Sequence, residues 1–399
     1  MDTYLSQLLI AGHEPKVLSA NREPAPYAEK VKQLLLQNRV RLLPLTRGEK
    51  VASAVALSAV HPLFALRIAR VAFALFSGED TPRARALATV NSLASAWPAF
   101  GGHTPNVVHV HSLKDGAFQV PAALARHIPV VVTFHGLEPV GVKQLSLTRA
   151  RMLFSVASVV CVNTRFAAQQ ALAMGCPASR IKILPQGLPL EEFPHTPRPL
   201  PRDGEPLRIL SVGRFHRDKG QQYSLLAAAR LMRNGVNFRW DMVGVGPELN
   251  ELKKMTASLG LSELVKFSVG IPRDSVKEMY RQSHILVLAS VGGTDLSEHV
   301  ETQGVVLQEA QASGCVPIAS AVGGIPECIE HGVSGFLIPD RSHRAIASAI
   351  LELSRDEKRY AGMQKAAREL VESHFSADVI GREMSSMLEA VANQSLPHA

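Results

Sequence analysis

Two glutamates, Glu301 and Glu309, lie eight residues apart behind a strand-like apolar run over residues 284–290. A polar loop with glycines follows that run, and Gly304 opens a helix that carries Glu309 about two turns beyond Glu301. Open parallel α/β sheets bind ligands beyond the carboxyl ends of their strands. Because a carboxylate accepts paired hydrogen bonds, two of them here suit a ligand rich in hydroxyl groups. The alternative is that both are solvated charges, favoured by the dipole at a helix start.

A second stretch, residues 211–220, leaves another predicted strand and is rich in basic residues. Gly213 allows a tight exit from the strand, and Gly220 opens the next helix. Between them, Arg214 and Lys219 project from the loop. Fixed positive charge beside the N–H donors of a helix N-terminus is the arrangement that binds a diphosphate. A solvated basic loop is the alternative.

Two further turns are rich in glycine. Residues 243–248, Val-Gly-Val-Gly-Pro-Glu, follow a predicted strand, but they lack the third glycine and the acidic residue of a dinucleotide site. A plain strand-to-helix turn explains them better. Gly323 and Gly324 precede Pro326 at the start of a helix expected over 325–331, where their N–H groups could cradle an anion. A tight turn that merely needs glycine explains this pair equally well.

Three histidines end two neighbouring predicted strands in the first half of the chain. His109 and His111 end the strand over 106–111, and His135 ends the strand over 129–135. A metal site would need further ligands, and neither a carboxylate nor a cysteine has suitable spacing. We therefore expect no metal site; lone histidines on strands are more often structural, and His135 is the best site candidate in this half. The sequence contains no serine or cysteine nucleophile elbow.

Strands alternate with helices over most of the chain, which predicts two doubly wound parallel α/β sheets. Residues 194–206 hold five prolines in thirteen positions and form the predicted linker. The expected fold is two Rossmann-like domains facing a cleft. The first covers 1–193, with helices over 50–76 and 82–99; the second covers 207–374, and a C-terminal helix covers 375–399.

The net charge of +8 is unevenly distributed. Residues 1–199 carry 21 Lys and Arg against 11 Asp and Glu, or +10, while residues 200–399 carry 22 against 24, or −2. An asymmetry of this kind favours an anionic surface or ligand near the first half. Aromatic residues make up only 5% and no aromatic-basic interleaving occurs, which argues against nucleic acid. An anionic membrane face fits the charge, and a diffuse excess of arginine without a target fits it too.

The four cysteines show no paired spacing, which is typical of a reduced, cytoplasmic protein. The N-terminal sequence lacks the basic region of a signal peptide. The longest uncharged apolar run near the front, residues 51–66, has 16 residues and is too short to cross a bilayer. We expect a cytoplasmic protein, peripheral at the inner face of the membrane.

Taken together, these stretches resemble the family 4 glycosyltransferases of the GT-B fold, with similarity strongest over about 207–340. The resemblance is closest to enzymes of exopolysaccharide assembly of the colanic-acid type. The motifs that carry it are the E-x7-E pair Glu301 and Glu309, the G-R-x4-K-G loop with Arg214 and Lys219, Val-Gly-Val-Gly-Pro at 243–247, Gly-Gly-Ile-Pro-Glu at 323–327, Thr-Phe-His-Gly at 133–136 and Leu-Pro-Gln-Gly-Leu-Pro-Leu-Glu-Glu-Phe at 184–193.

The resemblance implies a role for each site residue. Arg214 and Lys219 would bind the diphosphate of a nucleotide-sugar donor and balance its charge as the nucleotide leaves. Glu309 would hold the ribose hydroxyls, and Glu301 would contact the transferred sugar near its anomeric carbon. The remaining contacts to sugar and phosphate would come from the backbone of Gly304, Val305, Gly323 and Gly324, with His135 across the cleft.

The same resemblance implies a hexosyl transfer with retention of anomeric configuration and without a metal ion. No cofactor is expected, since the nucleotide-sugar is a substrate. The acceptor would be a saccharide or a lipid-linked saccharide, and the basic first half would face it. Family precedent returns the C-terminal helix to the first domain.

Several positions depart from the family pattern. Residues 1–14 match the helix that follows the family's first strand and Gly-Gly loop, so both are expected upstream of Met1 or missing from a truncated variant. Gln186 and Pro189 replace a usual Asn and Asp, and Asn163 stands where Ser is common. A catalytically impaired, nucleotide-sugar-binding scaffold subunit is therefore the alternative function. A nicotinamide oxidoreductase would rest on residues 243–246 alone.

Overall fold

The structure is a computed structural model that describes residues 7–19, 40–42, 46–78, 81–100, 104–111, 116–136, 143–202, 204–293 and 300–393. The chain divides into two compact units. Unit 1 contains Met1–Asn163, Ala168–Leu184 and Gly381–Ala399, and unit 2 contains Thr164–Ala167 and Pro185–Ile380.

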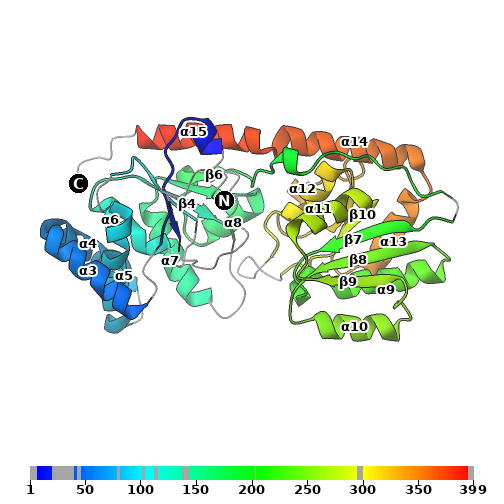
Figure 1. The fold of residues 1–399 in the computed structure, drawn as a ribbon, viewed down its shortest axis with the longest axis horizontal. Helices are drawn as coiled ribbons and strands as arrows, with labels where there is room; N and C mark the ends of the chain where they lie inside the picture. Colours follow the sequence, from blue (N-terminus) through cyan, green and yellow to red (C-terminus); the bar gives the residue numbers. More distant parts are fainter. Residues whose placement is uncertain are drawn as a thin grey trace. The chain divides into compact units, whose positions relative to one another are not determined.

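Unit 2 is built on a sheet of six parallel strands in the order β12-β11-β10-β7-β8-β9 (Figure 1). The strands are β7 (Leu207–Val212), β8 (Phe238–Gly244), β9 (Val265–Val269), β10 (Ile285–Leu288), β11 (Val316–Ser320) and β12 (Phe336–Ile338). All four residues of β10 are buried, as expected for a central strand covered on both faces.

Helices cover both faces of this sheet (Figure 1). One layer contains α9 (Gln221–Arg233), α10 (Leu249–Ser258) and α13 (His343–Leu353), and the other contains α11 (Arg273–Gln282), α12 (Val305–Ser313) and α14 (Glu357–His374). Apolar side chains from the first layer pack on one face around Trp240, whose indole N–H donates to Ser211 Oγ at 3.1 Å. A second cluster, containing Leu307 and Tyr280, fills the other face.

Unit 1 contains a second parallel sheet, in the order β3-β4-β5-β6. Its strands are β3 (Val108–Val110), β4 (Val130–Phe134), β5 (Val159–Val162) and β6 (Ile181–Ile183), with α6 (Val120–Leu124), α7 (Lys143–Val156) and α8 (Arg165–Ala173) between or beside them. Strands β1 (Val17–Ser19) and β2 (Val40–Leu42) form a separate parallel pair. Both units are thus α/β domains built on parallel sheets, which confirms the predicted fold class.

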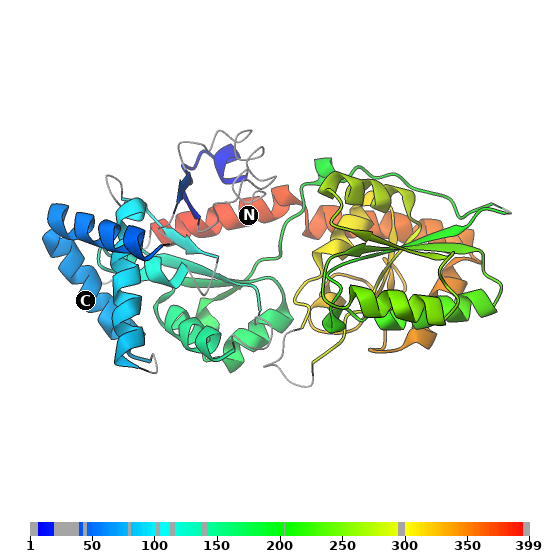
Figure 2. The ribbon, with the colours of Figure 1, turned by 60° about the horizontal axis from the view of Figure 1, so that its bottom comes forward.

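Three helices form a group of their own in unit 1 (Figure 2). They are α3 (Arg47–Val60), α4 (Pro62–Leu75) and α5 (Pro82–Phe100). The stretch predicted to be helical over 50–76 forms two helices, α3 and α4, because the chain breaks at His61. Pro62 is the first residue of α4, where its missing N–H costs no hydrogen bond, and His61 N donates to Leu57 O to close α3.

The helix predicted over 325–331 is wrong. Only a 3-10 turn forms, over Ile325–Glu327. The chain then takes other hydrogen bonds: the Cys328 carbonyl accepts from Gln311, and the Glu330 N–H donates to Ser334 Oγ at 2.9 Å. These hydrogen bonds, to Gln311 and Ser334, take the place of the backbone hydrogen bonds that a helix would need.

The C-terminal helix α15 (Ala377–Ala392) follows α14 after a short break, and from Gly381 it groups with unit 1. Within unit 1, His13 Nε2 lies 2.6 Å from Ser385 Oγ. None of the helices in the described part of the chain is long and apolar enough to cross a membrane. Residues 1–6 lie outside the described residues, so the expectation about the start of the first domain stays a prediction.

Candidate active site

The order of the strands in unit 2 determines where a ligand site can form. The chain runs from β7 outward through β8 to β9, and β10 then returns to the other side of β7. The loops that follow β7 and β10 therefore leave the same sheet edge from adjacent strands and diverge. Such a switch point is where open α/β sheets bind ligands. It brings the 213–220 loop and the loop before Glu301 together.

The 213–220 loop is held in place by its backbone. Gly213 N donates to Val243 O at 2.9 Å, and Gln221 Nε2 donates to Arg214 O at 2.8 Å. Gly220 has a φ of 62°, and a Cβ there would lie 1.9 Å from Ala289 O. Glycine is therefore required for the loop to lie against the end of β10.

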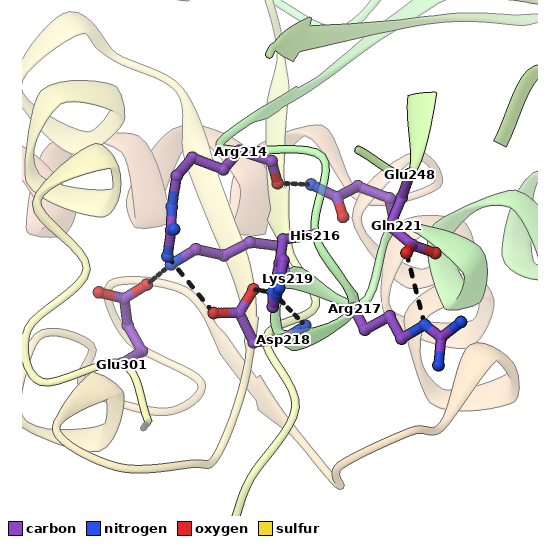
Figure 3. A network of polar contacts seen from close by, with 8 residues as sticks. All are labelled: Arg214, His216, Arg217, Asp218, Lys219, Gln221, Glu248 and Glu301. Atoms are coloured by element: carbon purple, nitrogen blue, oxygen red, sulfur yellow. Dashed lines mark hydrogen bonds and ion pairs between the residues drawn. The ribbon is translucent and has the colours of Figure 1, made fainter. Parts of the chain in front are cut away.

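Lys219 and Glu301 form an ion pair at this switch point (Figure 3). Their side chains are only 15% and 18% exposed. The pair joins the loop after β7 to the loop after β10, across 82 residues of sequence. Because the site is poorly hydrated, each charge gains more from a partner here than on the open surface. An incoming anion would compete with Glu301 for the Lys219 ammonium group.

Arg214 belongs to the same network but is more open (Figure 3). Its side chain is 51% exposed and lies 3.5 Å from Asp218 Oδ2. Asp218 also lies 2.7 Å from His216 Nδ1. The sequence interpretation did not single out His216 or Asp218 as site residues. The position of Asp218 within a basic loop could have indicated that its carboxylate contacts the loop's cations. The Asp218 carboxylate thus contacts both Arg214 and His216 and fixes the orientation of their side chains.

Glu309 has a separate set of partners on α11 and α12. Its Oε2 accepts a hydrogen bond from the Tyr280 hydroxyl at 2.8 Å, and its Oε1 lies 3.9 Å from Arg273. Burial raises the pKa of the Glu309 carboxyl, although the Tyr280 hydrogen bond and Arg273 oppose the rise. Burial likewise raises the pKa of Tyr280, with the Glu309 charge as the next cause. Tyr280 and Arg273 were also missed, because nothing local to them signals a distant carboxylate.

The paired glycines at 323 and 324 hold the backbone on which Glu301 sits. Gly324 N donates to Glu301 O at 2.9 Å, and a Cβ on Gly324 would lie 1.8 Å from Thr302 O. A Cβ on Gly323, which has a φ of 55°, would lie 2.1 Å from Glu301 O. The N–H of Gly324 is thus engaged by protein, and the expected open cradle is wrong at that residue. The pair positions Glu301 through close backbone contact.

Gly304 is the N-cap of α12 and has a φ of 73°. Glycine has no side chain that could accept a hydrogen bond from the first turn of α12. The backbone N–H groups at the start of this helix, from Val305 on, therefore need other acceptors. Residues 294–299, in the loop before Glu301, lie outside the described residues.

The glycines at 244 and 246 have a structural explanation. A Cβ on Gly244 would lie 2.0 Å from Gly213 O, and one on Gly246 would lie 2.3 Å from Phe215 O. Both glycines allow the 213–220 loop to approach the end of β8. Their presence therefore needs no dinucleotide, in agreement with the interpretation as a strand-to-helix turn.

The three histidines of unit 1 gather at the ends of β3 and β4, as predicted. The ring centroids of His109 and His111 are 4.1 Å apart, and those of His111 and His135 are 6.1 Å apart. His109 Nε2 lies 2.7 Å from Thr133 Oγ1. Burial, aided by His135, lowers the pKa of His109 to about 4, and burial also lowers the pKa of His135. The cluster is therefore neutral near pH 7.

No set of three or more His, Cys, Asp or Glu side chains within the described ranges is arranged to hold a metal ion. The residues predicted for the donor site fall into two groups. Arg214, Lys219 and Glu301 meet in one network, whereas Glu309 lies on α12 with its own partners.

Known protein families match both halves of the chain. Residues 3–192 match the family described as Glycosyltransferase Family 4, and residues 192–370 match the family described as Glycosyl transferases group 1. The protein named colanic acid biosynthesis glycosyltransferase WcaL, from Escherichia coli K12, is 31% identical over 296 residues, which cover 72% of each chain. The amylovoran biosynthesis glycosyltransferase AmsK of Erwinia amylovora is 32% identical over 240 residues, covering 60% of this chain and 58% of AmsK.

Solved structures show the same fold. The crystal structure of Anabaena HepE in complex with UDP has a TM-score of 0.65 at 19% identity and covers 94% of this chain and 100% of that one. The predicted GT-B fold and family resemblance are thus confirmed. The chain belongs to glycosyltransferase family 4 and is a glycosyltransferase of exopolysaccharide or glycolipid synthesis.

Proposed function

We propose that the protein moves a hexosyl group, with retention of configuration, from a nucleotide-sugar donor to a saccharide or lipid-linked saccharide acceptor. The product would belong to an exopolysaccharide or another cell-envelope glycan, as the names of the colanic acid and amylovoran relatives suggest. The observation that carries the proposal is the Lys219–Glu301 ion pair beside Arg214, at the switch point of the unit 2 sheet.

The diphosphate of the donor is proposed to bind Arg214 and Lys219. Both cations are on the loop after β7, and Arg214 is open enough to reach a ligand. The N-terminus of α12, at Gly304 and Val305, adds backbone N–H groups and the positive end of a helix dipole. As the nucleotide leaves, negative charge grows on the diphosphate, and these groups stabilise it. Fixed cations thus take the role of a divalent ion, so we propose a metal-independent reaction.

Glu301 is proposed to contact the transferred sugar near its anomeric carbon, with the Gly323–Gly324 pair holding its backbone. When the diphosphate binds the Lys219 ammonium group, the ion pair between Lys219 and Glu301 is broken. The Glu301 carboxylate is then available to the sugar. Glu309 is proposed to accept hydrogen bonds from the ribose hydroxyls, with Tyr280 fixing its orientation. Two carboxylates thus recognise two different hydroxyl-bearing parts of one donor.

Glu309→Ala is expected to weaken donor binding by about 10- to 100-fold, because hydrogen bonds to a charged acceptor are lost. Tyr280→Phe keeps the buried ring and removes only the 2.8 Å hydrogen bond to Glu309, so a smaller loss of about threefold to tenfold is expected. Titration calorimetry with the donor measures both. Glu251→Gln, on the exposed surface of α10, is the matched control. Unchanged affinity in Glu309→Ala would remove Glu309 from the ribose site.

His135 is proposed, on the family resemblance, to contact the transferred sugar. Its lowered pKa keeps the ring neutral near pH 7, able both to donate and to accept a hydrogen bond. His135→Ala is expected to lower kcat by about 100-fold while donor affinity stays within a fewfold of the parent. His374→Ala, at an exposed position on α14, is the control. Full activity in His135→Ala would show that the histidine cluster is only structural.

A thermal-shift panel of UDP-, GDP- and ADP-sugars, with and without a chelator, tests the proposed function. One nucleotide class should raise Tm regardless of chelator, with a stabilisation of about 2.7 kcal/mol at a donor concentration of about 100 Kd. Analysis of the product by NMR should then show retained anomeric configuration. Binding without hydrolysis or transfer would instead support the scaffold role, and no shift in a folded protein would contradict donor binding.

The place of action is proposed from the charge of the chain. The excess of basic residues in 1–199 suits a cytoplasmic protein at the inner face of an anionic membrane, where a lipid-linked acceptor would be presented. Fractionation of cells that produce the protein, followed by a salt wash of the membranes, would show whether it associates there.

A further inference from the structure

Exposed apolar side chains gather on the α3–α5 group of unit 1. The described part of the chain has fourteen large apolar side chains that are strongly exposed, and eight of them lie on these three helices. They are Val51, Val55, Val60, Leu63, Leu66, Phe73, Leu87 and Val90. Scattered single exposed apolar residues need no explanation, but a concentration of this kind marks an interaction surface.

Helix α4 shows the pattern most clearly. Leu63, Leu66 and Phe73 are 76%, 50% and 53% exposed, and Arg67 and Arg70 stand between them in sequence. Spacings of three, four and seven residues place all five side chains on one face of the helix. The opposite face, with Ala65, Ile68 and Ala72, is buried in unit 1. The helix thus presents an outer face that mixes long apolar side chains with arginines.

The charge of this surface is one-sided. The described side chains of α3–α5 include five basic residues against one acidic residue, Glu49. The basic residues are Lys50, Arg67, Arg70, Arg83 and Arg85. Glu49 is occupied in the capping box of α3 with Thr46. Neither Arg67 nor Arg70 forms an ion pair with any described carboxylate. The two guanidinium groups are therefore available to an external anion.

A basic hollow of about 500 Å³ adjoins the apolar face at the start of α4. Leu63, Phe64 and Arg67 line it on the α4 side, and Thr104, Arg126 and His127 line it on the other. Arg126 Nη1 donates to Thr104 Oγ1 at 2.9 Å, and its guanidinium lies 4.2 Å above the Phe64 ring. None of the residues described as lining the hollow is acidic. It has the size, polarity and charge for a phosphate-bearing headgroup.

We propose that the outer face of α4, with the corner at Val60 and the adjoining hollow, docks on an anionic phospholipid bilayer. The apolar side chains would enter the boundary between headgroups and acyl chains, while Arg67, Arg70 and Arg126 would bind lipid phosphates. A basic amphipathic helix lying in the interface plane binds by this combination of burial and charge. Charge complementarity favours an anionic bilayer over a second copy of this chain, whose corresponding surface would carry the same positive charge.

The test is sedimentation of the full chain with lipid vesicles, in the absence of donor. Binding is expected to vesicles of phosphatidylcholine with 30% phosphatidylglycerol, added here as an anionic lipid, and to be at least tenfold weaker to phosphatidylcholine alone. Arg67→Gln and Arg70→Gln should each weaken partitioning about fivefold. Leu63→Gln should weaken it about tenfold, because the burial of one leucine is lost. All three side chains are exposed, so the fold should be kept, and Tm and circular dichroism check this.

Matched controls use residues outside the proposed surface. Leu172→Gln on α8 removes a leucine that is 45% exposed, and Arg230→Gln on α9 removes an exposed arginine. Both should bind vesicles like the parent chain. Equal binding by all variants, binding independent of lipid charge, or a concentration-dependent dimer without vesicle binding would each overturn the proposal. Saturable binding of inorganic phosphate without vesicle binding would overturn it as well.

The docking surface rests on the proposed place of action at an anionic membrane and not on the proposed donor chemistry. A chain that binds nucleotide-sugar but no vesicles would refute the surface and leave the transferase proposal intact. A chain that binds vesicles but no donor would support the docking surface and refute the transferase proposal.

Discussion

Lys219→Ala is expected to lower kcat/KM by about 100- to 1000-fold, the effect of removing one strong stabilising group from a developing anion. Lys219 is better buried than Arg214, with a side chain 15% exposed against 51%. Its charge therefore acts on the leaving diphosphate with little screening by water. The substitution also leaves the Glu301 carboxylate without its partner, which disturbs the second part of the site.

Three further variants make this result interpretable. Lys219→Arg should recover part of the activity because it keeps the charge in altered geometry. Arg214→Ala should reduce both donor affinity and turnover, but by less than Lys219→Ala. Arg217→Ala, in the same loop, removes an arginine that is 83% exposed and paired with Glu248, so activity close to the parent is expected. If Lys219→Ala behaved like Arg217→Ala, the loop would not be the diphosphate site.

Glu301→Gln is expected to lower kcat by about 100-fold or more, while affinity for the nucleoside diphosphate product is kept or increased. The amide has the same shape as the carboxylate but no charge, so contact with the charge that develops near the anomeric carbon is weakened. Lys219 also loses the carboxylate that competes with the diphosphate for its ammonium group. The opposite movement of turnover and product affinity distinguishes this role from a purely structural one.

The measurement combines steady-state kinetics with calorimetry of the nucleoside diphosphate that the thermal-shift panel identifies. Glu248→Gln serves as the control, since Glu248 pairs with Arg217 on the outer side of the same network (Figure 3). Lower product affinity at unchanged turnover would mean that Glu301 only supports the fold of the loop. The ion pair with Lys219 would then be no part of the reaction.

Most of the elements of unit 2 could be predicted from the sequence. Strands and helices alternate through unit 2 as predicted, from β7 (Leu207–Val212) onward. These elements follow from local patterns, namely continuous apolar runs for buried parallel strands and amphipathic spacing for helices. The helix expected over 325–331 failed because its backbone groups find partners that the local pattern does not show, including Gln311.

The candidate site likewise could be predicted only in part from the sequence. The residue types were readable in sequence, since a carboxylate pair, a basic loop and glycine turns each have a local meaning. The partners of those residues were not. Asp218 and His216 orient the basic loop, and Tyr280 holds Glu309 from another helix. A hydrogen bond between residues 29 positions apart depends on how two helices pack, and no local periodicity encodes it.

By itself, the sequence determined the chemistry available to this protein: a basic loop after one strand, a pair of spaced glutamates after another, and a basic first half. Only the tertiary structure decided that those strands are neighbours. The return of β10 beside β7 joins Lys219 to Glu301 across 82 residues, and the contacts of Gly323 and Gly324 hold Glu301 there. The exposed face of α4 was likewise decided by packing, because burial of Ala65, Ile68 and Ala72 turns its leucines and arginines outward. Adjacency and exposure are properties of the whole packed chain, and a run of residues specifies them only through the fold.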